Sequence, residues 1–132
     1  PEPVFDPAFE DDPRWPQALI IGTQKAATTS VFDWLARHIN LTCPMQNNKD
    51  PDREIHSGKE AHFFDATHGP EIAQQATLSP EEARRLTMLY LDLFGNKCSA
   101  PVRMEATPNY LHNRDAPIAI YRLFPPKVRE RL

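Results

Sequence analysis

Apolar residues along this chain occur in two patterns, short continuous runs and helical spacing. A buried-looking run over residues 18–22 predicts a strand. From about Thr28 to His38, apolar side chains recur three or four positions apart, which predicts an amphipathic helix directly after that strand. Trp34 and Leu35 are expected to seal the helix against a sheet.

Two further helices carry clear start and stop signals. Ser79 is placed to cap a helix, Pro80 suits its first turn, and Glu82 completes a capping box, with Gly95 as the stop. A second helix is predicted over residues 116–124, where two prolines end it.

Short strands complete the pattern. Residues 60–65 and 102–105 are predicted to be extended, and the polar, proline-containing stretch over 40–59 is expected to be a long loop. This alternation of strands and helices predicts an α/β fold, a three-layer parallel sheet flanked by helices, with ligands at the carboxyl ends of the strands.

The first sixteen residues differ from the rest in composition. They hold five prolines and five carboxylates, so an extended and poorly ordered lead-in is expected over 1–16, a linker or stem, followed by one domain over 17–132. The net charge of -3 and the lack of basic runs argue against a nucleic-acid partner. No apolar run is long enough to span a membrane.

Cysteine and histidine spacing predicts no metal site. Neither residue type shows zinc spacing, and no oxygen-rich calcium loop is present. Cys43 and Cys98 form an even pair that a lumenal protein could join, although two separate buried thiols are the simpler interpretation.

The turn after the first strand has the composition of an anion site. It supplies one cation, Lys25, and a set of amides and hydroxyls at the start of the predicted helix: Ala26, Ala27, Thr28, Thr29 and Ser30. The first N–H groups of a helix have no partner within it and carry partial positive charge, so phosphate or sulfate is stabilised there. The alternative is a plain strand-to-helix turn with a solvated lysine.

Chemistry-bearing residues also mark the segment Lys59-Glu60-Ala61-His62-Phe63-Phe64-Asp65. If it is a strand, Glu60, His62 and Phe64 share one face while Asp65 lies on the other. Glu60 is the candidate base and Lys25 the candidate charge stabiliser, while His62 could orient Glu60, bind substrate, or be the base itself. The competing interpretation is solvated charges at the end of a strand.

Three ordered segments together resemble one enzyme family. The Gly-x-x-Lys-x-x-Thr-Thr loop lacks the second glycine of a Walker loop and resembles the 5'-phosphosulfate loop of sulfotransferases that use 3'-phosphoadenosine 5'-phosphosulfate (PAPS). Lys59 to Asp65 resembles the Lys-Glu-x-His-Phe-Phe-Asp segment of heparan-sulfate and related carbohydrate sulfotransferases. Glu105-Ala106-Thr107-Pro108-Asn109-Tyr110 resembles their Glu-Lys-Ser/Thr-Pro-x-Tyr segment.

This resemblance implies a P-loop-like nucleotide-binding architecture, PAPS as co-substrate without a metal, and a carbohydrate-type acceptor. It places Asp65, Glu105 and Tyr110 on the acceptor side, although Glu105 and Tyr110 could equally hold a turn. Ala106 and Thr29 stand where related enzymes carry cations, which puts heparan sulfate as the acceptor in doubt. The resemblance also implies the Golgi lumen, and a chain that stops before the 3'-phosphate site.

Two other functions fit parts of the same pattern. A diverged nucleotide kinase or hydrolase would need magnesium ligands, for which Asp33 and Asp65 are the nearby acidic candidates. A truncated α/β module that keeps the loop without catalysis is the second alternative.

Overall fold

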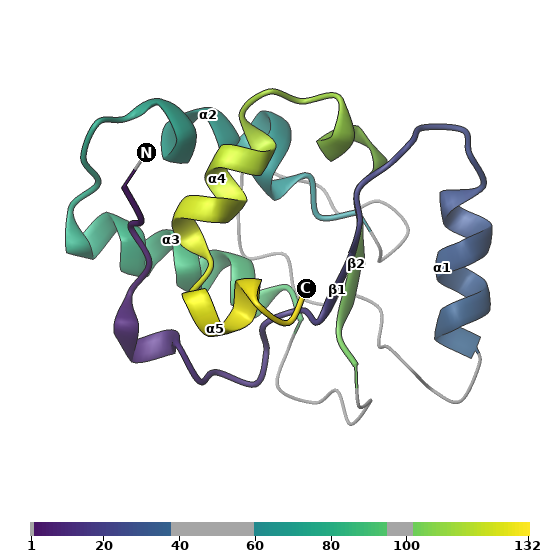
Figure 1. Cartoon of the computed structure of the whole chain (residues 1–132), viewed down its shortest axis with the longest axis horizontal. Coiled ribbons are helices and arrows are strands. Elements are labelled where there is room, and N and C mark those ends of the chain that lie inside the picture. Colours follow the sequence, from purple (N-terminus) through teal and green to yellow (C-terminus); the bar gives the residue numbers. More distant parts are fainter. Residues whose placement is uncertain (1, 38–59, 95–101) are drawn as a thin grey trace.

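The computed structural model describes residues 2–37, 60–94 and 102–132. These residues form a helix-rich chain around a small parallel sheet (Figure 1). Strand β1 (Ala18–Ile20) pairs with β2 (Met104–Ala106), and Leu19 lies opposite Glu105. A parallel pair needs a long crossover connection, which the intervening chain supplies. The α/β class is compatible with this arrangement, while the three-layer sheet stays a prediction.

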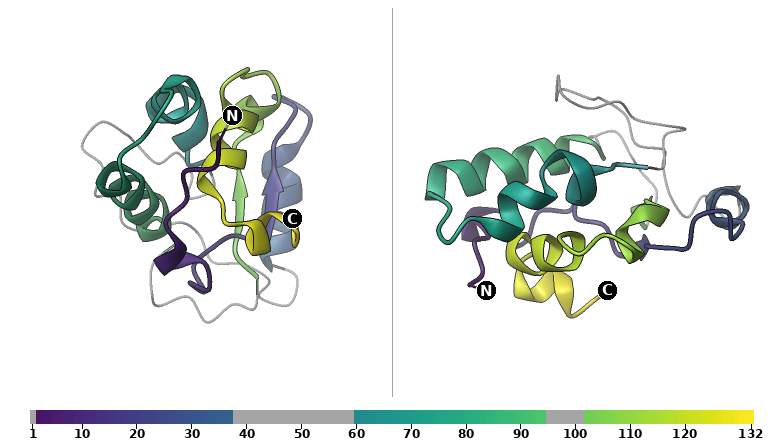
Figure 2. Two further views of the ribbon diagram at one scale, coloured as in Figure 1. Left: turned by 60° about the vertical axis from the view of Figure 1, so that its left-hand side comes forward. Right: turned by 90° about the horizontal axis from the view of Figure 1, so that it is seen from above.

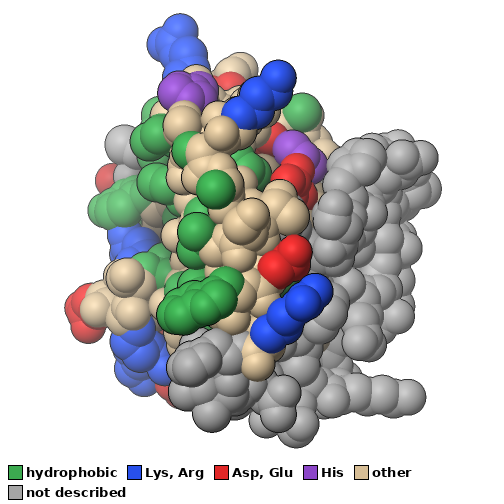
Figure 3. Space-filling view, turned by 90° about the vertical axis from the view of Figure 1, so that its right-hand side faces the viewer, with side chains coloured by type: hydrophobic (Ala, Val, Ile, Leu, Met, Phe, Trp, Pro, Cys, Tyr) green, Lys and Arg blue, Asp and Glu red, His purple; other side chains and the backbone are tan. Residues whose placement is uncertain are grey.

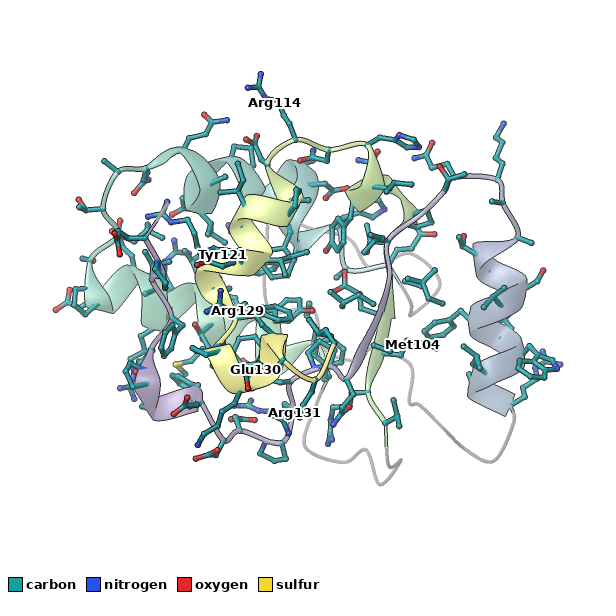
Figure 4. All side chains as sticks on the ribbon, viewed as in Figure 1. Met104, Arg114, Tyr121, Arg129, Glu130 and Arg131 are labelled. Carbon is teal, nitrogen blue, oxygen red and sulfur yellow. The ribbon has the colours of Figure 1, made fainter. Side chains whose placement is uncertain are left out.

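Helix α1 (Thr28–Arg37) matches the predicted helix and lies on one side of the strands, with the other helices on the opposite side (Figures 1 and 2). Phe32, Leu35 and Ala36 pack toward Met104 and Ala106 of β2, and Met104 lies between the strand and the helix (Figure 4).

The prediction for Trp34 is wrong, because its side chain is 63% exposed. At 100° per residue, Trp34 lies two positions and about 200° from the buried Phe32, on the solvent side of α1. Leu35 is partly buried against the sheet, as predicted.

The remaining helices enclose an aromatic core. Helix α3 (Pro80–Asp92) begins with the predicted capping box between Ser79 and Glu82, and α4 (Ala116–Leu123) matches the predicted helix before the proline pair. Two short helices, α2 (Gly69–Gln74) and α5 (Pro126–Arg129), were not predicted. The buried aromatic side chains at the centre include Trp15, Phe63, Phe64, Tyr90 and Phe124.

Residues 2–16 pack against this core, contrary to the expectation of a poorly ordered lead-in. A 3-10 turn, η1 (Pro7–Phe9), interrupts the segment, and Trp15 is 2% exposed. The Arg122 side chain explains the docking, because its guanidinium donates to backbone carbonyls of both Glu2 and Gln75. The N–H of Val4 in turn donates to the Arg122 carbonyl over 2.8 Å.

The segment after Glu60 is not the predicted strand. His62 has a left-handed backbone with φ of 48°, and Phe63–Thr67 forms a π-helical turn, η2. Side chains therefore do not alternate between two faces, and Asp65 comes to the same side as His62. A 3-10 turn, η3 (Pro108–Leu111), follows β2. No helix within the described residues is long and apolar enough to cross a membrane.

Candidate functional site

The loop between β1 and α1, residues 23–30, is called the anion loop below. Lys25 and Ala27 have positive φ angles of 59° and 58°, whereas Ala26 between them does not. Such alternation turns successive N–H groups toward one concave side, the geometry of backbone anion sites. No acidic residue lies in the first turn of α1, so nothing there opposes a bound anion.

The anion loop lines a pocket of about 380 Å³ together with the segments predicted to carry the chemistry. Lys25 and Glu60 both contribute to its wall, so two segments far apart in sequence lie side by side here. Figure 3 shows a histidine beside acidic side chains on the face of the molecule that carries α1. The other lining residues are Gln24, Ala27, Thr28, Thr29, His62, Pro108 and Asn109.

Two of the candidate loop residues are not in the pocket wall. Ala26 donates its N–H to the carbonyl of Thr23 over 3.1 Å and so closes the turn. Ser30 is exposed in the first turn of α1 without lining the pocket. The loop residues that do line the pocket are Gln24, Lys25, Ala27, Thr28 and Thr29.

Glu60, His62 and Asp65 form a hydrogen-bonded group, called the base cluster below. His62 Nδ1 lies 2.7 Å from Asp65 Oδ2, and His62 Nε2 lies 3.0 Å from Glu60 Oε2. Both ring nitrogens face carboxylate oxygens, an arrangement that suits a doubly protonated imidazolium. The bond to Asp65, with a smaller contribution from Glu60, raises the pKa of His62 above its ordinary value against the effect of burial.

Asp65 anchors the base cluster in the interior. Its side chain is 1% exposed, and it accepts hydrogen bonds from His62, from Asn109 Nδ2 at 2.9 Å and from the Ala66 N–H at 2.7 Å. Burial alone would raise the pKa of Asp65, but these hydrogen bonds outweigh it and hold the pKa below its ordinary value. Asp65 is therefore an ionised, buried carboxylate and not a solvated charge.

The third candidate segment lies mostly in the interior. Glu105 is fully buried and accepts hydrogen bonds from Tyr90 at 2.6 Å and from Thr107 at 2.8 Å. Tyr110 is 3% exposed. Its burial, and to a smaller extent the nearby charge of Glu105, raises the pKa of Tyr110 well above its ordinary value. These contacts favour the alternative in which Glu105 and Tyr110 hold the turn after β2.

The same turn braces the start of the anion loop. The Leu111 N–H donates to the Ile21 carbonyl over 2.8 Å, and His112 Nε2 lies 2.6 Å from Thr23 Oγ1. A side chain at Gly22 would come within 2.6 Å of Leu111, so this position accommodates only glycine without a shift. The glycine of the loop motif thus serves close packing of η3 against the strand end.

Sequence reasoning missed two residues of the site, Asn109 and Thr107. Both lie inside the Glu105 to Tyr110 segment, so that motif was the available signal, but their contacts with residues 61–65 span more than 40 positions. Cys43 and Cys98 lie outside the described residues, as does Lys59. No group of three or more metal-ligating side chains occurs in the described parts of the chain.

Comparison with known proteins finds heparan sulfate sulfotransferases among the relatives of this chain. The human heparan sulfate glucosamine 3-O-sulfotransferase 6 is 30% identical over 112 residues, which cover 85% of this chain and 25% of that protein. The human 3A1 and 3B1 enzymes of the same name are also 30% identical, over 84% and 80% of this chain and 20% of theirs. The chain thus spans a fifth to a quarter of these relatives. The resemblance to carbohydrate sulfotransferases is confirmed.

No family model matches the chain. No solved structure matches it either.

Proposed function

Because the chain is related to heparan sulfate 3-O-sulfotransferases over most of its length, we propose that it forms the sulfuryl-transfer centre of a PAPS-dependent carbohydrate sulfotransferase. The observation that carries this proposal is the pocket shared by the anion loop and the base cluster. A site for a sulfated phosphate and a carboxylate base are the two parts that sulfuryl transfer to a hydroxyl requires.

The anion loop would hold the 5'-phosphosulfate end of PAPS in a P-loop-like manner. Lys25 supplies a side-chain cation, and the N-terminus of the ten-residue helix α1 supplies partial positive charge. Thr28 and Thr29 line the pocket and offer further donors. These groups neutralise charge that develops on the phosphate oxygen as the sulfuryl group departs.

The reaction balances with Glu60 as base. The acceptor hydroxyl oxygen forms a bond to sulfur, and the bond between sulfur and the 5'-phosphate oxygen breaks with its electron pair passing to that oxygen. The hydroxyl proton passes to Glu60, and 3'-phosphoadenosine 5'-phosphate leaves. His62, with one nitrogen on Asp65 and the other on Glu60, orients the base. Of the three roles open to His62, these contacts favour this one.

The acceptor in this proposal is a carbohydrate hydroxyl or amine. The named relatives are glucosamine 3-O-sulfotransferases of heparan sulfate, and a Golgi location would follow from them. Ala106 and Thr29 provide no cation for an acidic polysaccharide, so the acceptor class is proposed without assigning heparan sulfate. Asp65 is assigned to holding His62, because its side chain is buried.

The kinase or hydrolase alternative is less favoured by the same contacts. Asp33 is exposed on α1 and is not among the residues that line the pocket, while Asp65 is already engaged by His62 and Asn109. Neither carboxylate is placed as a magnesium ligand beside the anion loop. A non-catalytic module is distinguished from an enzyme by experiment.

Calorimetric titration of the chain with 3'-phosphoadenosine 5'-phosphate tests the proposal. Weaker binding in Lys25→Ala with unchanged binding in Lys127→Ala would support it. Lys127 is the matched control because it is exposed, lies far from the loop in sequence and pairs with Asp11. A folded chain that does not bind the nucleotide, by circular dichroism and calorimetry together, would leave the non-catalytic module. Magnesium-dependent binding of ATP in its place would favour the kinase.

A further inference from the structure

Two buried hydroxyl groups hold four consecutive backbone N–H groups beneath the base cluster. The Ala61 and His62 N–H groups donate to Thr107 Oγ1 over 3.0 and 3.3 Å. The Phe63 and Phe64 N–H groups donate to the Tyr110 hydroxyl over 3.1 and 3.3 Å. Side chains after β2 therefore replace the strand ladder that these N–H groups would otherwise need.

The direction of the Thr107 hydroxyl is set by Glu105. A hydroxyl has one proton and two acceptor lone pairs. The Thr107 proton goes to Glu105 Oε1 at 2.8 Å, so both lone pairs face the two N–H groups, while Tyr90 donates to Glu105 Oε2 at 2.6 Å. Thr107, Glu105 and Tyr90 are each at most 1% exposed, so water does not compete for these bonds.

This arrangement has a direct consequence for His62. Its φ of 48° is costly for a residue with a side chain, and such a conformation persists only where its surroundings determine it. By accepting hydrogen bonds from the Ala61 and His62 N–H groups, Thr107 Oγ1 fixes the peptide groups before and after Ala61. The second of these peptide groups is the one whose orientation relative to the His62 Cα defines φ at His62. The turn then aims the imidazole between Glu60 and Asp65.

We propose that Thr107 is a positioning residue for the base cluster: its buried hydroxyl, directed by Glu105, holds the left-handed turn at His62 and thereby the contact between His62 and Glu60. The expected effect of Thr107 on catalysis rests on the proposed sulfotransferase function. Its effect on the position of His62 does not, because that effect concerns contacts within the chain alone.

The pKa of the His62 ring, followed by NMR, tests the proposal. Among the described residues, Glu60, Asp65 and Lys25 are the charged groups that face this ring or line its pocket, and none of them is changed in the variants. In Thr107→Val the pKa of His62 is expected to fall toward the ordinary histidine value, because the ring loses its place between two carboxylates. Thr107→Ser keeps the hydroxyl and is expected to restore the wild-type pKa.

Tyr90→Phe is the matched control. It removes the hydrogen bond from Tyr90 to Glu105, so it also disturbs the buried network, but it leaves the Thr107 hydroxyl and the Ala61 and His62 N–H groups in place. Its His62 pKa should match the wild type even where its stability is lower. An unchanged pKa in a folded Thr107→Val, or an equal fall in Tyr90→Phe, would overturn the positioning role.

Hydrogen exchange in the wild-type chain provides a test that needs no variant to fold. If Thr107 holds the turn, the Ala61 and His62 amides should exchange as slowly as amides in the middle of α3. Exchange as fast as that of the exposed amides of the anion loop would contradict the proposal.

Failure of this inference and failure of the proposed function give different results. If the chain binds no nucleotide but the His62 pKa responds to Thr107→Val, the function fails and the positioning role stands. If the chain is active, Thr107→Val should lower the transfer rate by on the order of tenfold to a hundredfold with unchanged nucleotide affinity. A rate equal to that of the wild type would remove Thr107 from the mechanism.

Discussion

The anion loop and the base cluster meet in one pocket but are built in opposite ways. Lys25, Ala26 and Ala27 are exposed, and the loop offers backbone N–H groups and one flexible cation. The base cluster consists of side chains anchored from below, with Asp65 only 1% exposed and the backbone beneath it bonded to buried hydroxyls. One half of the site presents exposed groups on a loop that Leu111 and His112 brace at its start, and the other half is fixed within the packed interior.

This difference separates the effects that substitutions should have. Changes in the anion loop should weaken ligand binding and leave the fold intact, since exposed side chains contribute little to stability. Changes beneath the base cluster should cost stability and leave nucleotide binding intact, since buried polar groups without partners are costly. Changes at Glu60 should affect the chemical step alone.

The largest effect is expected for Glu60→Gln. Loss of the base should slow sulfuryl transfer about 100- to 10,000-fold, because the acceptor proton has no carboxylate to receive it. Transfer is measured with radiolabelled donor sulfate, and nucleotide affinity should stay at the wild-type value. Glu81→Gln, at the exposed start of α3, is the matched control and should retain full activity. Wild-type turnover in Glu60→Gln would remove this residue from the mechanism.

Lys25→Ala should weaken binding of 3'-phosphoadenosine 5'-phosphate by about tenfold to a hundredfold, the range expected for loss of a charge-assisted hydrogen bond. Calorimetry measures the affinity, and thermal unfolding should give the same midpoint as the wild type. If Lys25→Ala unfolds at a lower temperature but binds the nucleotide normally, Lys25 contributes to stability and not to ligand binding, contrary to the prediction for the anion loop.

Tyr110→Phe should lower the free energy of unfolding by about 1–3 kcal/mol, because the N–H groups of Phe63 and Phe64 lose their acceptor. Urea denaturation measures this loss. Nucleotide affinity should be unchanged, since Tyr110 does not line the pocket. Weaker nucleotide binding without a stability change would assign Tyr110 to the ligand.

The smallest effect is the pH dependence of stability from the His62–Asp65 pair, on the order of 1 kcal/mol or less. Because the pKa of His62 is raised in the folded chain, protonated His62 stabilises the fold. This contribution is complete below the pKa of histidine in the unfolded chain, and it is lost as the pH rises through the folded-state pKa. Because the pKa of Asp65 is lowered in the folded chain, ionised Asp65 also stabilises the fold. This contribution is complete above the pKa of aspartate in the unfolded chain, and it is lost as the pH falls through the folded-state pKa. Both contributions are therefore complete between about pH 4 and pH 6.5.

Urea denaturation across this pH range compares the wild type with His62→Gln. The difference in unfolding free energy between them should be largest inside the window and shrink on either side. A difference that is constant with pH would show that the ion pair contributes nothing.

Local signals predicted helices α1, α3 and α4 and the position of the anion loop. The capping box at Ser79 and the apolar spacing after Thr28 depend on neighbours within four positions, so sequence alone places α3 and α1. The loop motif likewise lies within a few residues of Lys25. The prediction for Trp34 was wrong because burial follows the angle around the helix, and Trp34 lies about 200° from the buried Phe32.

Contacts between distant residues explain what sequence reasoning missed. The alternation of Glu60, His62 and Phe64 favours a strand. Instead, the N–H groups of residues 62–64 donate hydrogen bonds to the hydroxyls of Thr107 and Tyr110, 45 to 47 positions away, and the segment forms a turn. Residues 1–16 have a disordered composition, yet Arg122 fixes Glu2 from 120 positions away. No local pattern at Glu60 or Glu2 encodes these partners.

NMR titration of the labelled chain with 3'-phosphoadenosine 5'-phosphate tests most directly whether the two halves form one site. The amides from Ala27 to Thr29 and the ring of His62 are predicted to shift together and to saturate at one dissociation constant, since both line the same pocket. Shifts confined to one half, or saturation of the two halves at different concentrations, would contradict the account.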